Sequence, residues 1–85
     1  MRIEWEDHAF ADLEAIVERA PRQAKRVLEA IDVLAASPFP GMFRRRQGHD
    51  AEHLLTVVWT PYLVIYRLLR EQSVLSIVRV LDGRR

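Results

Sequence analysis

The stretch HLLTVVWTPYLVIYRLLREQSVLSIVRVL, residues 53–81, decides the fold. Its runs of β-branched and aromatic residues are broken at 60–61 and at 70–72, which predicts three strands over 53–59, 62–69 and 73–81. Connections this short join antiparallel neighbours, so the C-terminal half is expected to be an antiparallel sheet. Alternation along the last strand predicts one face made of Leu75, Ile77, Arg79 and Leu81.

Upstream of these strands, the hydrophobic period changes to that of helices. One apolar stripe follows Asp7, a suitable N-cap, and a second begins at Pro21 and ends before Pro38. The link between the two helices is short, which predicts an antiparallel helical hairpin. The stripes are Ala9, Phe10, Leu13, Ile16 and Val17, and then Ala24, Val27, Leu28, Ile31, Leu34 and Ala35.

Residues 3–5 predict a short first strand, and 42–47 a further, weakly marked one. The expected fold is therefore α+β: an N-terminal strand and an antiparallel helical hairpin packed on a three- to four-stranded, mostly antiparallel sheet, in one domain over 1–85. Both faces of the strand 62–69 are largely apolar, whereas a solvated sheet face alternates. We therefore expect another chain to cover part of the second face.

The composition limits the class of protein. A chain of 85 residues forms a marginal core, and without cysteine neither disulfides nor thiolate metal sites can stabilise it. The first residues carry charges where a secretion signal has an apolar segment, and no apolar run approaches the ~20 residues that span a bilayer. These features predict a cytoplasmic protein that does not contact the membrane.

The net charge of +1 hides an asymmetry. Residues 1–36 carry five basic and eight acidic side chains, whereas residues 37–85 carry eight basic and four acidic ones, and all eight basic ones are arginine. Arginine binds carboxylate and phosphate in a planar bidentate fashion. The C-terminal half thus suits an anionic partner, either nucleic acid or an acidic protein segment, although ordinary solubilising charge has the same composition.

The sequence lacks the motifs of metal-binding, phosphate-binding and nucleophilic sites. His8, His49 and His53 lack the spacing of a metal site, three glycines form no phosphate-binding loop, and the serines have no nucleophile motif around them. We therefore expect neither a metal nor a cofactor.

Two stretches resemble the C-terminal signature of the RelE/ParE toxin superfamily: TPYLVIYR at 60–67 and IVRVLDGRR at 77–85. In that superfamily, a strand with proline and tyrosine, three apolar residues, tyrosine and arginine precedes an ending of the form apolar-apolar-R-V-L-H-G-R. The first helix agrees, because Trp5, Ala9, Asp12 with Leu13, and Ile16 are similar to its family pattern, and Pro40 and Gly41 lie where the family often has this pair.

The resemblance implies the toxin of a type II toxin–antitoxin system, a growth inhibitor of the kind that stabilises plasmids. Its cognate antitoxin protein would be encoded beside it and would form a hetero-oligomer with it. In this family a segment of the antitoxin wraps the toxin, and an acidic, initially disordered segment would suit the apolar sheet face and the arginine-rich half.

Two activities occur in the superfamily. RelE-like members cleave mRNA on the ribosome with an arginine in the central strand and often a late histidine or tyrosine, whereas ParE-like members poison DNA gyrase and are not known as enzymes. Here Leu63 stands at the arginine position and Asp82 at the late histidine. An aliphatic side chain cannot stabilise the charge on a scissile phosphate, which favours the ParE-like reading and leaves enzymatic activity open.

If the chain is instead a ribosome-dependent endoribonuclease, its candidate catalytic residues are Tyr66, Arg67, Arg79 and Arg84. The candidates for binding the target or the antitoxin are Arg44, Arg45, Arg46, Arg79, Arg84 and Arg85. All of them except Arg67 have a structural alternative: a packed strand aromatic for Tyr66, an ion pair for Arg79, a solvated segment for 44–46 and a disordered tail for 84–85. A third hypothesis is an inactive relic that binds only an antitoxin.

Overall fold

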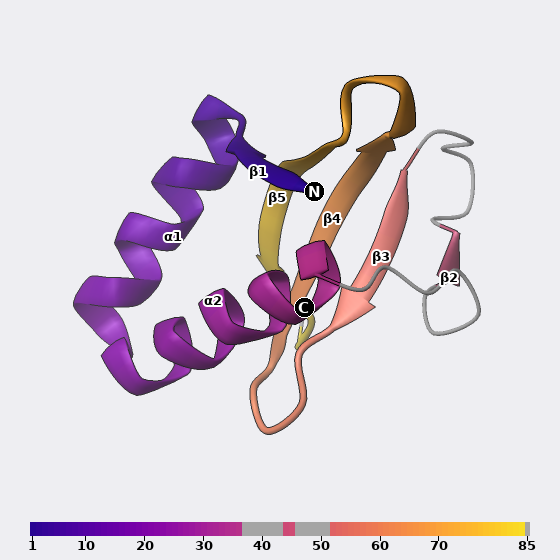
Figure 1. Ribbon diagram of the computed structural model, residues 1–85. Coiled ribbons are helices and arrows are strands. Elements are labelled where there is room, and N and C mark those ends of the chain that lie inside the picture. The colour runs from indigo at the N-terminus through magenta and orange to yellow at the C-terminus, as the bar shows by residue number, and fades with distance from the viewer. Residues whose placement is uncertain (37–43, 46–51, 85) are drawn as a thin grey trace.

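A computed structural model describes residues 1–36, 44–45 and 52–84 (Figure 1). The expected α+β fold is confirmed, with a strand, two helices and a sheet in chain order. The elements are β1 (Arg2–Trp5), α1 (Asp7–Arg19), α2 (Pro21–Ala36), β2 (Arg44–Arg45), β3 (His53–Thr56), β4 (Tyr62–Leu69), the 3-10 turn η2 (Arg70–Gln72) and β5 (Val74–Asp82).

The sheet has the strand order β1-β5-β4-β3-β2. Strand β1 runs parallel to β5, and the other three pairings are antiparallel, as the short connections predict. Strand β1 pairs with β5 only as far as Trp5 opposite Ile77. Beyond Ile77 no described strand pairs with that edge of β5, and this open edge faces the next element, α1.

Helix α1 differs from its prediction in two ways. Asp7 is the first helical residue rather than the cap, and Glu6, which takes the cap position, makes no side-chain capping bond. Within the predicted stripe, Ala9 and Ile16 are buried, but Phe10 is 51% and Val17 47% exposed. The stripe is narrower than predicted because α1 packs against β5 and α2 through Ala9, Leu13 and Ile16 only.

Helix α2 begins at Pro21 as predicted and buries five residues of its stripe, Ala24, Val27, Ile31, Leu34 and Ala35. Leu28 is the exception, at 39% exposure. Only Ala20 separates the helices, which spread apart from it along one side of the sheet (Figure 1). The terminal amine of Met1 donates to the carbonyl of Ala35 at 2.8 Å and ties the start of β1 to the end of α2.

A β-bulge changes the faces of β5. Ile65 lies opposite Arg79, and Tyr66 lies opposite Ile77, so Val78 is the extra residue. The single face predicted from Leu75 to Leu81 is therefore wrong after Ile77, because the bulge returns Val80 to the core, where it is 4% exposed. Arg79 is displaced from the core face by the same bulge.

Strand β3 is shorter than predicted because the chain turns before Trp59, which adopts a left-handed φ of 68°. The face of β4 opposite the helices includes Ile65, which is also buried, at 1% exposure.

No helix among the described residues is long and apolar enough to cross a membrane.

Candidate functional site

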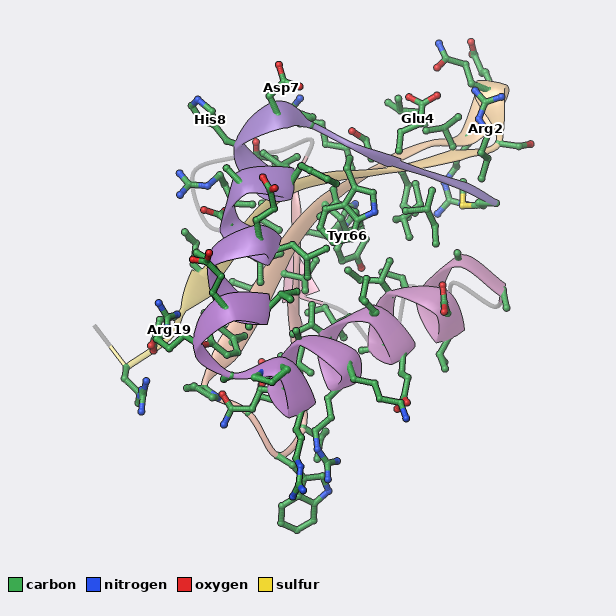
Figure 2. All side chains as sticks on the ribbon, turned by 90° about the vertical axis from the view of Figure 1, so that its left-hand side faces the viewer. Arg2, Glu4, Asp7, His8, Arg19 and Tyr66 are labelled. Carbon is green, nitrogen blue, oxygen red and sulfur yellow. The ribbon has the colours of Figure 1, made fainter. Side chains whose placement is uncertain are left out.

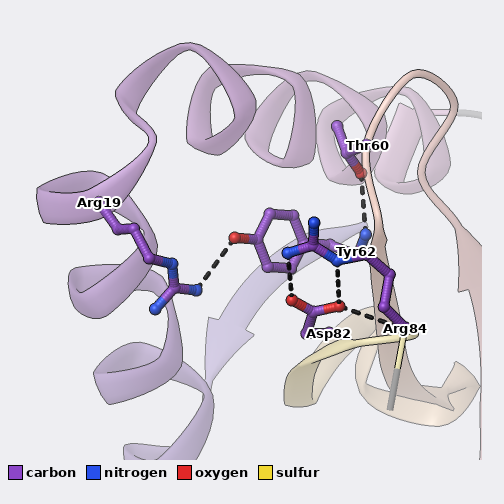
Figure 3. Close-up of polar contacts among 5 residues, drawn as sticks. All are labelled: Arg19, Thr60, Tyr62, Asp82 and Arg84. Atoms are coloured by element: carbon purple, nitrogen blue, oxygen red, sulfur yellow. Dashed lines mark hydrogen bonds and ion pairs between the residues drawn. The ribbon is translucent and has the colours of Figure 1, made fainter.

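A groove of about 670 Å³ runs between α1 and the end of β5. We call it the α1–β5 groove. One wall is the face of α1 that points to the sheet, and the other is the end of the sheet with the tail that follows it (Figure 3). Its lining consists of Asp12, Ala15, Ile16, Arg19, Tyr62, Val80, Leu81, Asp82 and Arg84.

Asp12 joins the two walls. Its carboxylate accepts two hydrogen bonds from Arg79, at 2.7 Å from Nε and 3.0 Å from Nη2, and a third from the backbone N–H of Val80 at 2.9 Å. This third bond occupies the edge of β5 that β1 leaves open. The hydrogen bonds and the charge of Asp12 raise the pKa of Arg79, whose side chain remains 39% exposed. The ion-pair alternative stated for Arg79 is therefore present in the structure.

Arg84 lies at the mouth of the groove and is held by Asp82. Its Nε and Nη2 donate to the two carboxylate oxygens at 3.1 and 2.8 Å, and its backbone N–H donates to Oδ1 at 2.9 Å. These bonds raise the pKa of Arg84. Gly83 allows this turn because a Cβ there would lie 3.1 Å from the carbonyl of Pro61 and 3.2 Å from Leu63, tighter than side chains normally pack.

Arg19 is a groove residue that the sequence analysis did not single out. Its Nη2 donates to the hydroxyl of Tyr62 at 3.0 Å, and the backbone N–H of Tyr62 is itself fixed by Thr60 Oγ1 at 3.0 Å (Figure 3). No carboxylate in the described part of the chain forms an ion pair with Arg19. The helical spacing of Asp12, Ile16 and Arg19 places all three on one side of α1. This spacing is the feature of the sequence from which the position of Arg19 beside Asp12 could have been predicted.

Tyr66, a candidate proton donor for a nuclease, lies elsewhere. It is completely buried in the core beneath the helices, where its ring stacks on His53 with centroids 5.3 Å apart (Figure 2). Burial raises the pKa of its phenol above the ordinary value of 10.0. A macromolecular substrate at the surface does not reach this hydroxyl in the described conformation.

Arg67 lies on the opposite face of the sheet. Its guanidinium donates to Glu52 at 2.9 Å and lies 3.5 Å from Glu6, which also accepts a bond from Ser76 Oγ at 3.2 Å. Arg67 lies five positions along β4 from Tyr62 at the groove, about 16 Å at the rise of a strand. The structure thus brings Arg84 and, through Asp12, Arg79 to the groove, and it places Tyr66 and Arg67 away from it.

The other predicted binding residues are only partly described. Arg44 and Arg45 form β2 and pair with Leu54 and His53 of β3. Arg46 and Arg85, with Pro40, Gly41 and His49, lie outside the described residues.

The lining of the groove combines charged and apolar groups. Among the described residues, it offers the donors of Arg19 and Arg84, with Arg79 behind Asp12, beside the apolar Ile16 and Val80. Guanidinium groups bind carboxylates and phosphates in this way.

The fold is that of known bacterial toxins. The isolated RelE toxin of E. coli superposes with a TM-score of 0.81 and 12% identity over 99% of this chain and 85% of that one. The toxin–antitoxin complex RelBE2 of Mycobacterium tuberculosis gives 0.78 and 23% over 95% of each chain, and the chromosomal ParDE system of P. aeruginosa gives 0.76 and 21% over 96% of this chain and 95% of that one. These similarities define the class of fold, which the chain shares with the RelE, RelBE2 and ParDE structures.

Within that class, residues 3–85 match the family model of the ParE toxin of the type II toxin–antitoxin system parDE. The chain belongs to this family, as the resemblance predicted. No curated protein sequence shows significant similarity to it.

Proposed function

We propose that this chain acts in the cytoplasm as a ParE-like inhibitor of DNA gyrase and that a cognate antitoxin neutralises it. The inhibition is by binding, and the α1–β5 groove with its arginines is the contact surface. The family model that matches the chain is that of ParE toxins, which supports this choice over the RelE-like activity.

The separation of the four nuclease candidates supports the proposal most directly. Tyr66 is enclosed in the core, and Arg67 is held by Glu52 on the other face of the sheet. Arg79 and Arg84 are each bound to an aspartate through two guanidinium nitrogens. Cleavage of RNA needs cations directed at the developing phosphate charge, and here two carboxylates occupy these donors.

The same arrangement suits a binding surface. An ion-paired arginine on a groove is held in one rotamer, so less side-chain entropy is lost when it contacts a partner. Arginine is also enriched among the residues that dominate protein interfaces. Arg84, with 71% of its side chain exposed, is the best placed for this role.

An antitoxin partner is proposed on two grounds. Structures similar to this one include the toxin–antitoxin complexes RelBE2 and ParDE. In addition, this chain exposes large apolar side chains such as Leu28 and Leu69. A wrapping partner would remove such surface from water.

The test is plasmid supercoiling by purified gyrase with the folded chain added and no antitoxin present. We expect loss of supercoiling with accumulation of cleaved DNA. Arg84→Ala should raise the concentration for half-inhibition by about tenfold or more. Arg70→Ala is the matched control, because Arg70 is exposed in η2 and does not line the α1–β5 groove.

Full supercoiling at micromolar concentrations of a chain shown to be folded would contradict the proposal. Ribosomes with mRNA would then be the next substrate, with Arg79→Ala tested for loss of cleavage while antitoxin binding persists. Inactivity in both assays would favour the third hypothesis, an inactive relic that binds only an antitoxin.

A further inference from the structure

Two surfaces of the molecule combine exposed apolar side chains with unpaired charge, and neither belongs to the α1–β5 groove. The first is on α1. Phe10, three residues after Asp7, and Val17, seven residues after Phe10, are both about half exposed, and Glu14 lies between them. These positions and Glu18 share one flank of the helix, which we call the acidic face.

Among the described residues, the acidic face has no ion-pair partner. Asp7, Glu14 and Glu18 are exposed, and in the described part of the chain none of them forms an ion pair. Figure 2 shows Asp7 pointing away from the body of the protein at the start of α1. Glu14 and Glu18 stand four residues apart, where like charges repel and destabilise a helix.

The second surface, which we call the basic patch, is formed by α2 and the turn between β3 and β4. Val33 is 66%, Val58 67% and Trp59 81% exposed, and they line a depression of about 270 Å³ together with Arg26, Glu29, Ala30, Thr56 and Val57. An adjoining depression of about 390 Å³ is lined by Arg22, Lys25, Arg26 and Glu29. The patch therefore joins three cations and one carboxylate to three exposed apolar side chains.

Charge repulsion is repeated in the basic patch. Arg22 and Arg26 are four residues apart on α2, with Lys25 beside them, and no described carboxylate forms an ion pair with any of the three. Each surface therefore carries the like-charge pair that the other would neutralise. Among the described residues, no ion pair relieves either one.

Trp59 is a second feature that destabilises the isolated monomer. Its φ of 68° lies in the left-handed region, which bulky side chains rarely adopt, and its indole is almost entirely in water. A tryptophan in this setting contributes little to the core. Tryptophan is, however, enriched among the side chains that dominate protein interfaces.

We propose that the acidic face of one copy of this chain docks into the basic patch of a second copy. Phe10 and Val17 would cover the exposed Trp59, Val58 and Val33, and the carboxylates of α1 would meet the cations of α2. The two surfaces lie on different elements, so the contact is head-to-tail. Each added copy leaves one acidic face and one basic patch open for the next copy.

The aliphatic part of the basic patch favours a protein over a nucleic acid. A phosphate backbone would use the cations, and a base would stack on Trp59, but Val33 and Val58 have no role in such a contact. An acidic segment of a different protein would leave Phe10 and Val17 exposed on α1. A second copy accounts for both surfaces, and the small number of side chains predicts association on the micromolar scale.

Sedimentation velocity on the folded full-length chain across the micromolar range tests the proposal. We expect concentration-dependent association that weakens as salt is raised, because it depends on exposed charges. Trp59→Asn and Phe10→Gln should each weaken it by about 30-fold, the effect of a dominant interface residue. Asparagine tolerates the left-handed backbone, and circular dichroism would show that both variants remain folded.

Mixing the two variants gives the decisive result. Trp59→Asn retains an intact acidic face, and Phe10→Gln retains an intact basic patch, so an equimolar mixture should form a dimer that grows no further. Charge reversal supplies a second measurement. Glu14→Arg and Arg26→Glu should each weaken association, their double variant should restore it, and Arg70→Glu should leave it unchanged.

A wild-type chain that stays monomeric across this range would overturn the proposal. So would a mixture that behaves as two monomers, since that excludes complementary surfaces. Tight binding of an acidic peptide or of DNA to the basic patch without self-association would assign the patch to that partner instead.

Discussion

At the scale of single residues, Asp12 replaces a neighbouring strand at the open edge of β5. It accepts the N–H of Val80 and both donors of Arg79, so one carboxylate fixes α1 against the sheet. The sequence offered an ion pair with a carboxylate as one role of Arg79, but it did not identify the carboxylate, because Asp12 is 67 residues away. Only the docking of α1 decides the partner.

Asp12→Ala should lower the free energy of unfolding by about 2 kcal/mol, because it removes a charge-assisted pair that is partly exposed and leaves Val80 N–H without its acceptor. Urea unfolding measures this. Asp32→Ala, the same change at an exposed position of α2, should stay within about 0.5 kcal/mol of the wild type. Equal losses in the two variants would contradict the anchoring role of Asp12.

The buried phenol of Tyr66 predicts that the folded state loses stability at alkaline pH. Burial raises the pKa of its phenol in the folded state above the ordinary 10.0, so above pH 10 the unfolded chain releases a proton that the folded chain retains. Stability should be unaffected by this group below pH 10 and should fall above it, by up to about 1.4 kcal/mol per pH unit. Urea unfolding of Tyr66→Phe should show a smaller decrease in the free energy of unfolding above pH 10. If the free energy of unfolding of the variant fell with pH as steeply as that of the wild type, the Tyr66 phenol would be excluded as the cause.

At the scale of elements, the sequence predicted which segments form helices and strands better than which side chains they bury. The period of α1 correctly gave a helix, yet Phe10 and Val17 are about half exposed. A helical stripe shows which residues share a side, but the width of the buried part depends on how the helix meets the sheet. The bulge at Val78 is similarly unmarked, because it follows from the fit of β5 to β4.

A matched pair of substitutions on α1 tests this distinction. Ile16 is 2% exposed and lies in the core, so Ile16→Ala should cost about 3 kcal/mol through lost burial and the cavity left behind. Val17→Ala, its neighbour in the predicted stripe, should change stability by less than about 0.5 kcal/mol. Thermal unfolding of dilute chains gives both values. A large loss of stability in Val17→Ala would show that Val17 contributes to the core.

At the scale of the whole molecule, the distribution of charge along the sequence differs from its distribution in space. The basic half was assigned to residues 37–85, yet three of its arginines, Arg67, Arg79 and Arg84, are each paired with a carboxylate, whereas Arg70 forms no ion pair among the described residues. The described cations without an ion pair also include Arg19, Arg22, Lys25 and Arg26, which lie in the net acidic segment. The sequence counted charges correctly, but it could not show which of them cancel, because the pairing depends on contacts between distant segments.

This difference predicts how the folded chain interacts with an anionic surface. A paired arginine has a carboxylate within 4 Å, so the field of the pair decays within the screening length of about 10 Å, whereas unpaired cations on one helix add together. The triple variant Arg22→Gln, Lys25→Gln, Arg26→Gln should therefore elute from a cation exchanger at clearly lower salt than the wild type. The triple variant Arg2→Gln, Arg67→Gln, Arg84→Gln removes the same formal charge from paired positions, so it should shift elution less. Coincident elution of the two variants, with circular dichroism showing both folded, would mean that net charge alone governs the interaction.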